Sequence, residues 1–264
     1  MADRVTKTRP PQRAASGSRN GHPTVGPGRR LLAVLTAFAE PATPMSAEEI
    51  SERLSIPRST VYRFLTLLRE FDLVEESVGG KCQLGPAAVT LGYAARATAN
   101  LDQMWRPAMQ AIADESRESV LVLRRMSTHA VCIDRIESQH PVRLSFEIGR
   151  VMPLHTGAGA KLLLSETDDH FIDEYEKGQV PAAHRKALRQ DIDQIRQRGW
   201  SESHSEVDPG IWAVAFPLLN SKDRHYCITV ALPEYRATDE LKEQVTRLLD
   251  VQTKELRQRF AQMH

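Results

Sequence analysis

Residues 29–70 restrict the possible folds more strongly than any other part of the chain, because they encode three short helices with tight connections. The first helix is predicted over residues 29–40, where apolar side chains recur every three or four residues. Ser46 and Glu49 form a capping box, a hydroxyl followed three residues later by a glutamate, and so predict the start of a second helix. We expect this short helix to bury Ile50 and Leu54.

The third helix is predicted over residues 59–70, after a tight turn at residues 55–57. Its apolar stripe, which we expect to face the other two helices, consists of Val61, Phe64, Leu65 and Leu68. Two short helices joined by a turn of a few residues, and braced by a third, form a helix-turn-helix. The sequence therefore predicts this motif near its N-terminus.

Two extended runs follow within residues 72–84, around Gly79 and Gly80, a dipeptide that tight β-hairpins prefer. A hairpin directly after the third helix is the wing of a winged helix-turn-helix. In such domains the second helix of the motif enters the major groove with its N-terminal residues at base edges, while the wing and the preceding arm contact the backbone. We therefore expect double-stranded DNA as a partner.

The candidate DNA contacts come from three parts of this region. They are Arg58, Ser59, Thr60, Tyr62 and Arg63 of the third helix, Arg29 and Arg30 next to the arm, and Lys81 of the wing. Plainer alternatives exist, since Ser59 and Thr60 could cap the helix. Tyr62 could be half-buried, and Arg63 could be an ordinary solvated charge. The combination of motif, wing and basic arm favours DNA binding.

The charge of the chain is segregated along the sequence. The formal net charge is only +1, which by itself argues against general binding of polyanions. Residues 1–30, however, hold seven basic residues and one acidic residue, a net charge of +6. Residues 1–25 are dense in Pro, Gly, Ser and Arg, so we expect a disordered basic arm that meets DNA phosphates. The alternative is a solubilising tail.

The remainder of the chain alternates helical and β-rich patterns. A helix over residues 87–100 links the wing to a helix around residues 105–116. We then expect strands at 119–125, 130–136 and 142–146, helices at 156–165, 168–176 and 182–198, strands at 211–219 and 225–232, and a terminal helix at 238–262. This order predicts an α+β domain with an antiparallel sheet covered by helices.

Three stretches of the sequence resemble the IclR family of transcriptional regulators. Residues 46–92 resemble the N-terminal domain of that family, including STVYR at the start of the recognition helix and the pair Leu84-Gly85 after the wing. RVMPLHTGAGAKLLL at 150–164 and RGWSESHSEVDPGIWAVAFP at 198–217 resemble its C-terminal segments. The resemblance implies a winged helix-turn-helix, a linker helix and an effector domain similar to GAF and PAS sensors. It also implies a homodimer or a dimer of dimers.

A ligand site is expected at residues 156–160, where small residues at a helix start leave backbone N–H groups free to bind an anion. The family resemblance assigns binding of the effector carboxylate to Gly157 and Ala158. The expected walls are Met152, Leu154, Ile211, Ala213, Thr229 and Ala231. The alternative is that Gly157 and Gly159 only allow close packing of the helix on the sheet.

The expected pocket departs from the family pattern in two places. Ser203, His204 and Ser205 stand where the family commonly has acidic residues, just before the glutamate matched by Glu206. Residues 229–233 read Thr-Val-Ala-Leu-Pro where the family often reads Ser-x-Ser-Gly-Pro. A pocket with fewer hydroxyls and carboxylates favours a small carboxylate or aromatic-acid effector, less polar than the smallest acids that the family senses.

Catalytic, metal and membrane functions have little support in the sequence. Cys82, Cys132 and Cys227 lack metal-site spacing and are interpreted as small buried hydrophobes. Neither H-E-x-x-H nor G-x-S-x-G occurs, and no apolar run approaches the about 20 residues that cross a bilayer. We expect a cytoplasmic protein with no catalytic residues, no metal site, no cofactor and no membrane partner.

The predicted domains are a disordered basic arm at 1–25, a winged helix-turn-helix at 26–86, a linker helix at 87–100, and an effector-binding and oligomerisation domain at 101–264. With the resemblance, this organisation predicts a ligand-responsive DNA-binding regulator of a catabolic operon, and a repressor more readily than an activator. Two alternatives stay open. One is a DNA-binding regulator whose C-terminal domain only oligomerises, and the other is a small-molecule-binding protein or enzyme with a vestigial helix-turn-helix.

Overall fold

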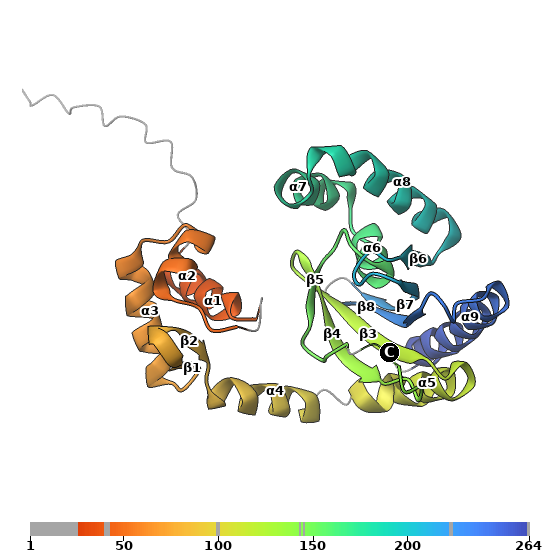
Figure 1. Ribbon diagram of the computed structural model, residues 1–264, viewed down its shortest axis with the longest axis horizontal. Coiled ribbons are helices and arrows are strands. Elements are labelled where there is room, and N and C mark those ends of the chain that lie inside the picture. Colours follow the sequence, from red (N-terminus) through yellow and green to blue (C-terminus); the bar gives the residue numbers. More distant parts are fainter. Residues whose placement is uncertain are drawn as a thin grey trace, which may run out of the picture.

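The computed structural model describes residues 26–39, 43–98, 101–142, 144, 146–221 and 224–262. The predicted basic arm, residues 1–25, lies outside the described residues. A helix, α4 (Pro86–Thr98), joins an N-terminal domain of three helices and a hairpin to a C-terminal domain of mixed helices and strands (Figure 1). The predicted fold class, an α+β protein with an N-terminal winged helix-turn-helix and an antiparallel sheet in its second domain, is confirmed.

The N-terminal domain consists of α1 (Pro27–Ala37), α2 (Ala47–Leu54), α3 (Arg58–Glu70), β1 (Val74–Glu76) and β2 (Cys82–Leu84). α1 begins two residues earlier than predicted, with Pro27 in its first turn, where the backbone N–H that proline lacks has no partner inside a helix. All four residues of the predicted α3 stripe are buried, together with Val34 of α1 and Ile50 of α2. The three helices therefore share one core.

The capping box forms as predicted. The Glu49 N–H donates to Ser46 Oγ at 3.1 Å, and the Ser46 N–H donates to Glu49 Oε2 at 2.6 Å. α2 ends at Ser55, which adopts the left-handed conformation with a φ of +52°. This short turn places α3 directly after α2, as a helix-turn-helix requires.

The hairpin lies where the sequence predicts it, but its turn is longer. β1 and β2 pair antiparallel, with Val74 opposite Leu84. A 3-10 turn at Val78–Gly80 replaces the expected two-residue turn, and the Ser77 N–H donates to the Lys81 carbonyl at 2.7 Å. Both glycines of the turn have positive φ, +75° and +72°, a conformation that glycine adopts without a steric penalty.

The C-terminal domain is built on a six-stranded antiparallel sheet in the order β5-β4-β3-β8-β7-β6. The strands are β3 (Ser119–Met126), β4 (His129–Ile136), β5 (Val151–Pro153), β6 (Ser201–His204), β7 (Ile211–Ser221) and β8 (Arg224–Pro233). The predicted strands at 119–125, 130–136, 211–219 and 225–232 all fall within these elements.

Helices cover both faces of the sheet (Figure 1). They are α5 (Leu101–Ser116) and α9 (Asp239–Gln262) on one face, and α6 (Ala158–Ser165), α7 (Asp169–Gln179) and α8 (Ala182–Arg198) on the other. Strand alternation divides the core in two, since Val120 and Val122 pack under α5 and α9 while Leu121 and Leu123 pack under α6.

One predicted strand, at residues 142–146, is wrong, because the described residues there have no strand conformation. Arginine side chains donate hydrogen bonds to backbone carbonyls in this segment. Arg236 Nη1 donates to Val142 O at 3.0 Å, and Arg135 Nη1 donates to Phe146 O at 2.7 Å. A carbonyl satisfied in this way does not need a neighbouring strand. The strand that pairs with β4 is β5 instead, and β5 and β6 are too short to carry a recognisable alternation.

Candidate DNA-binding and effector sites

The first half of α3 presents its polar side chains to solvent. The five residues predicted there are exposed or half-buried: Arg58, Ser59, Thr60, Tyr62 and Arg63. Tyr62 has 51% of its surface exposed, so its aromatic ring is available to a partner. α3 begins after Pro57 without any side-chain cap, which removes the alternative that Ser59 or Thr60 caps this helix.

Acidic residues of α2 interact with three of the residues that are predicted to contact DNA. Glu48 Oε1 accepts a hydrogen bond from Tyr62 Oη at 3.2 Å and lies 3.7 Å from Arg58 Nη1. Glu49 Oε1 accepts a hydrogen bond from Lys81 Nζ at 3.0 Å. The pKa of each glutamate lies below its ordinary value, chiefly because a backbone N–H at the start of α2 donates to it. Both are charged at neutral pH, so a DNA phosphate has to compete with them.

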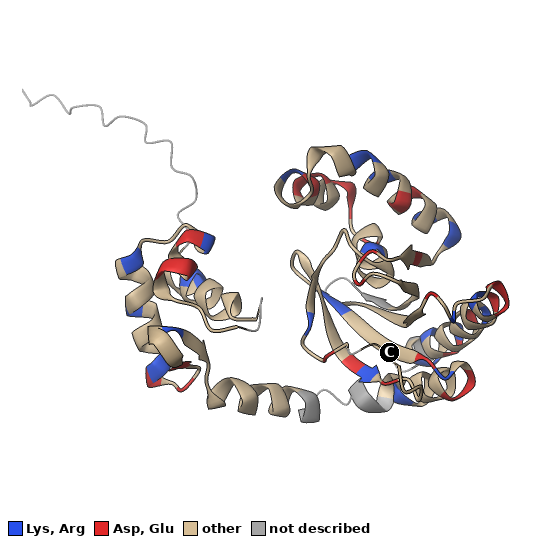
Figure 2. Cartoon of the chain, viewed as in Figure 1, with Lys and Arg blue, Asp and Glu red and all other residues tan. Residues whose placement is uncertain are grey.

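Arg29 and Arg30 lie in the first turn of α1, where Arg29 is exposed and Arg30 is half-buried. Basic and acidic residues both occur over the folded part of the N-terminal domain (Figure 2). Residues 31–100 hold six basic and eight acidic residues. The basic excess of the N-terminal region therefore comes from these two arginines and from residues 1–25.

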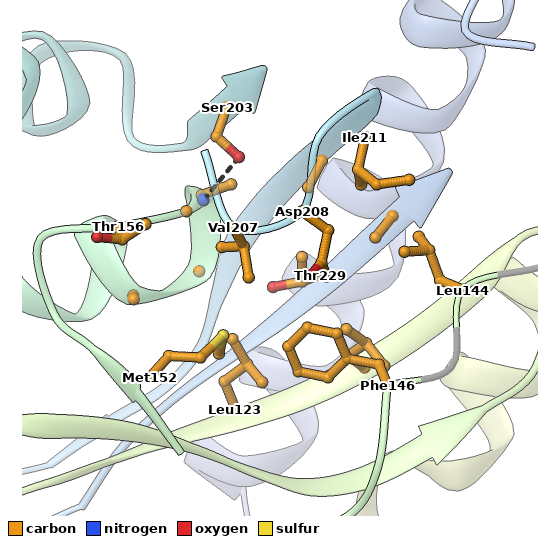
Figure 3. A pocket seen from close by; sticks show the side chains of 17 residues that line it. Leu123, Leu144, Phe146, Met152, Thr156, Ser203, Val207, Asp208, Ile211 and Thr229 are labelled. Carbon is orange, nitrogen blue, oxygen red and sulfur yellow. Dashed lines mark hydrogen bonds between the residues drawn. The ribbon is translucent and has the colours of Figure 1, made fainter. Parts of the chain in front are cut away.

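A cavity lies between the start of α6 and the sheet face that α6 covers (Figure 3). The volume of this cavity is about 40 Å³. One buried water needs about 10–15 Å³, so the cavity has room for about three waters, and a ligand the size of an aromatic acid requires the cavity to widen. Most walls are apolar, and the polar side chains that line it are Thr156, Ser203, Asp208 and Thr229.

Seven of the eight predicted effector-site residues line this cavity: Met152, Gly157, Ala158, Ile211, Ala213, Thr229 and Ala231. The eighth, Leu154, does not line it, and its prediction as a wall residue is corrected. β5 ends at Pro153, so the alternation that would place Leu154 beside Met152 stops one residue too early. The Leu154 side chain is wholly buried in the core under α6 instead.

Six further wall residues were missed. They are Leu121 and Leu123 of β3, and Leu144, Phe146, Val207 and Asp208 of two loops. The alternation of β3 could have identified the first two, because every second residue of that strand faces α6. No local pattern marks the other four, since the folding of two distant loops brings them together.

The expectation that the N–H groups of Gly157 and Ala158 are free is wrong for this structure. The Gly157 N–H donates to Glu206 Oε2 at 2.9 Å. The Ala158 N–H donates to Ser203 Oγ at 3.0 Å, the hydrogen bond that Figure 3 draws. A carboxylate of the chain itself therefore occupies the first anion-binding position of α6.

Two further N–H groups remain at the start of α6. The first intrahelical hydrogen bond runs from the Lys161 N–H to the Gly157 carbonyl at 3.0 Å. The N–H groups of Gly159 and Ala160 precede it, so they have no acceptor inside the helix. Both residues line the cavity, and the positive end of the helix dipole favours an anion there.

A buried lysine fixes the position of Glu206. Lys161 Nζ lies 2.6 Å from Glu206 Oε1 and 2.8 Å from Asp191 Oδ2, and only 5% of the lysine side chain is exposed. A buried charge of this kind is stable only when it is paired. The triad links the start of α6 to α8 and to the loop before β7.

The glycines of residues 156–160 have two different roles. Gly157 is the N-cap of α6 with a φ of +88°, which side-chain-bearing residues rarely adopt. A Cβ atom on Gly159 would lie 2.5 Å from Leu123 Cδ1 and 2.7 Å from Thr229 Oγ1. The alternative of close packing on the sheet therefore holds for Gly159, which brings its backbone against the cavity.

Arg150 and Asp208 connect two loops at the edge of the cavity. Arg150 Nη1 and Nη2 each donate to one oxygen of Asp208, both at 3.1 Å. The Arg150 guanidinium also lies 4.3 Å from the centre of the Phe146 ring, in a cation–π contact. Asp208 and Phe146 line the cavity, whereas Arg150 does not.

The buried cysteines of this domain are not activated, and the described residues form no metal-ion cluster. Within the part of the chain that the structure describes, no three His, Cys, Asp or Glu side chains are grouped to hold a metal ion. Burial raises the pKa of the Cys132 thiol to about 12 and also raises that of Cys227, so both stay protonated at neutral pH and are poor nucleophiles. Among the described helices, none is long and apolar enough to cross a membrane.

Comparison with known protein families identifies both domains of the chain. The family described as "IclR helix-turn-helix domain" matches residues 29–77, and the family described as "Bacterial transcriptional regulator IclR C-terminal" matches residues 94–256. The chain therefore belongs to the IclR family of bacterial transcriptional regulators, and its N-terminal domain is a DNA-binding helix-turn-helix. Members of this family are regulators of transcription and not enzymes.

Individual relatives agree with this assignment. The chain is 26% identical to the transcriptional repressor IclR of Escherichia coli (strain K12), over 80% of this chain and 81% of that protein. It resembles the crystal structure of an IclR regulator from Silicibacter sp. TM1040 with a TM-score of 0.77 at 20% identity, covering 89% and 96% of the two chains. An IclR homologue from Microbacterium hydrocarbonoxydans, complexed with 4-hydroxybenzoate, gives a TM-score of 0.63 at 19% identity, covering 88% and 99%.

Proposed function

We propose that this protein is a cytoplasmic, ligand-responsive transcriptional repressor of a catabolic operon, released from or recruited to its operator by a small carboxylic acid. The observation that carries the proposal is the pairing, in one chain, of an exposed recognition helix with a mostly apolar cavity at a helix N-terminus. Similarity to the Escherichia coli repressor supports repression over activation.

On the DNA side, α3 reads the operator with the polar residues of its first turns. We assign base contacts to Ser59, Thr60, Tyr62 and Arg63, and phosphate contacts to Arg29, Arg30, Arg58 and Lys81. The solvent exposure of the α3 residues supports this division. The basic residues of 1–25 add phosphate contacts that do not depend on sequence.

On the effector side, the acid group of the ligand lies at the start of α6. The N–H groups of Gly159 and Ala160 can donate to this acid group. Those of Gly157 and Ala158 can do so once their hydrogen bonds to the Glu206 carboxylate and to Ser203 are broken. The body of the ligand lies among the apolar walls. The binding of 4-hydroxybenzoate by the Microbacterium homologue supports an aromatic or similarly compact acid.

A second copy of the chain is the proposed oligomeric partner, as a homodimer or a dimer of dimers. α4 supports this, because it exposes 71% of Val89, 61% of Leu91 and 80% of Tyr93, apolar surface that a partner helix would cover. One recognition helix reads only a few base pairs, so two copies are needed for a specific operator.

The ligand acts by favouring one arrangement of the effector domain over another. Closure of the cavity around the acid would move the loop that carries Glu206 and Asp208, and the change would reach the paired recognition helices through α5 and α4. Operator affinity then changes by the difference in ligand affinity between the two arrangements, and by no more.

A thermal-shift screen of small monocarboxylic acids with the full-length protein tests the effector claim. We expect at least one acid to raise the melting temperature and to change the affinity for operator DNA. Gly157→Asp should abolish the shift, since it places a second carboxylate at the anion site, whereas Gly178→Asp, with open space around it, should not. Ala213→Met, which fills the cavity from β7, serves if Gly157→Asp does not fold. No shift over a broad panel would favour a C-terminal domain that only oligomerises.

A further inference from the structure

Asp208 is the one acidic side chain among the described residues that line the cavity. It points into the cavity, where Phe146 and Thr229 also project (Figure 3). The proposed function assigns this carboxylate no role. The Asp208 side chain is 37% exposed, so water stabilises the ionised carboxylate together with its protein donors, and a ligand that displaces this water has to offer a donor in its place.

Arg150 supplies two hydrogen-bond donors to the Asp208 carboxylate. Each carboxylate oxygen accepts one N–H from the guanidinium at 3.1 Å. A carboxylate has about four acceptor positions, so about two remain after this bidentate contact. Arg150 does not line the cavity and is held against the Phe146 ring. The remaining acceptor positions of Asp208 are open to water, which a ligand donor inside the cavity can replace.

The two polar sides of the cavity differ in chemistry. The α6 side offers donors, the N–H groups of Gly159 and Ala160, while the loop before β7 offers an acceptor, Asp208. Apolar walls such as Met152 and Ile211 complete the lining. A ligand carboxylate is attracted to the donor side and repelled from Asp208, because two like charges brought together out of water are unfavourable.

We propose that Asp208 determines which acids the cavity accepts: carboxylic acids with a compact apolar body and a hydroxyl or amino donor at the end remote from the acid. This rests on the proposed function, that the α6 cavity binds a carboxylate. The donor of the ligand hydrogen-bonds to Asp208, and Arg150 acts as a positioning residue that orients Asp208 from outside. Dicarboxylic acids of the same shape are rejected.

The test uses nine acids. They are three parent acids of increasing length, benzoate, phenylacetate and 3-phenylpropanoate, and the 4-hydroxy and 4-carboxy derivatives of each. Dissociation constants are measured by isothermal titration calorimetry on the full-length protein. For the length that fits, we expect the 4-hydroxy acid to bind about tenfold more tightly than the parent acid, the gain typical of a hydrogen bond to a charged group. The 4-carboxy acid should bind more weakly than the parent.

Asp208→Ala should remove the hydroxyl preference and release Arg150, so that the 4-carboxy acid becomes the tightest ligand of its series. Asp208→Asn, which keeps the shape of the side chain, serves if the alanine variant does not fold, and should lower the hydroxyl preference to about threefold or less. Asp193→Asn removes a carboxylate from the exposed surface of α8, outside the cavity, and should bind all nine acids as the unmodified protein does.

The proposal is overturned if the 4-hydroxy acids show no advantage at any length, if their advantage survives in Asp208→Ala, or if a 4-carboxy acid binds the unmodified protein best. If none of the nine acids binds while the wider screen finds another monocarboxylate, the assigned class is wrong and the effector site stands. If the wider screen also finds none, the proposed effector function itself fails.

Discussion

Two glutamates of α2 contact residues that we propose to bind DNA, and their negative charge opposes the binding of phosphates. Glu48 contacts Tyr62 and Arg58 through one oxygen, so it orders two of the proposed DNA contacts and also repels phosphates near them. Glu48→Gln should therefore tighten binding to random-sequence duplex DNA by about two- to fivefold, the range of an exposed ion pair. Its ratio of operator to random affinity should fall.

Fluorescence anisotropy on labelled duplexes measures both quantities. Glu52→Gln is the matched control, because it removes the same charge from the same helix on an exposed residue. Equal behaviour of the two variants would mean that only the net charge of α2 matters and that Glu48 has no special role.

Glu166 at the end of α6 should make stability depend on pH. Burial raises its pKa from an ordinary 4.5 to about 7, against the opposing effect of Arg257 and Arg125. The folded state therefore binds this proton more tightly than the unfolded state, so the stabilisation is complete below about pH 4.5 and is lost as the pH rises to about 7. The loss amounts to roughly 1–3 kcal/mol.

Urea denaturation of Glu166→Gln at pH 5 and at pH 8 measures this effect. The free energy of unfolding of the variant, relative to the unmodified protein, should rise by that amount between the two pH values, because glutamine carries no titrating proton. Glu174→Gln, a change on an exposed glutamate of α7, should show no such rise. A parallel pH dependence of all three proteins would refute the role of Glu166.

At the scale of single residues, the sequence predicted the cavity well where residues lie on regular strands or at a helix start. Met152, Ala213 and Thr229 were found in this way. Asp208 and Phe146 were not, because their places depend on loops whose paths are set by Arg150 and Arg135. Such long-range ion pairs and carbonyl contacts leave no periodic pattern in the sequence.

The elements themselves were predicted best where a periodic pattern runs over many residues. The α3 stripe and the long strands β7 and β8 gave strong signals, and their positions were correct. Residues 142–146 have strand-like composition, but the described ones, Val142, Leu144 and Phe146, lie outside the sheet. β5 and β6 have three and four residues and almost no pattern. Composition alone cannot distinguish a strand from a loop whose carbonyls are satisfied by side chains.

The junction between β2 and α4 depends on Gly85. A Cβ atom at this position would collide with the carbonyl oxygen of Asp72, so Gly85→Ala should destabilise the protein by about 1–3 kcal/mol through overpacking. Gly92→Ala, on open surface within α4, should instead leave stability unchanged or raise it by up to about 1 kcal/mol, because alanine favours helix. Denaturation midpoints measured by circular dichroism compare the two variants, and a neutral Gly85→Ala would contradict the close contact of Gly85 with the Asp72 carbonyl.

On the scale of the whole molecule, charge is divided between the parts. Residues 1–100 hold 13 basic and 9 acidic residues, while residues 101–264 hold 22 and 25. The folded N-terminal domain is itself slightly acidic, so we propose that its affinity for DNA in general comes mainly from the N-terminal arm. On this proposal, the domain that recognises sequence and the segment that supplies electrostatic attraction are separate.

Deletion of residues 1–25 should therefore weaken binding to every DNA sequence by a similar factor. The slope of log affinity against log salt should become less steep by about 0.9 for each phosphate that the arm neutralises in the full-length protein. Base preference should stay the same, since α3 is intact. Anisotropy titrations over a series of salt concentrations measure the slope, and an unchanged slope would show that the arm is only a solubilising tail.

The most direct measurement combines site selection with a change in α3. The unmodified protein selects its operator from a pool of random duplexes, and the affinity for that operator is compared between it and the double variant Thr60→Ala, Arg63→Ala. We expect the operator affinity to fall by about tenfold or more, the affinity for random DNA to change by less than about threefold, and the melting temperature to stay the same. Equal affinity of the two proteins for the selected operator would contradict the assignment of α3 as the helix that reads DNA.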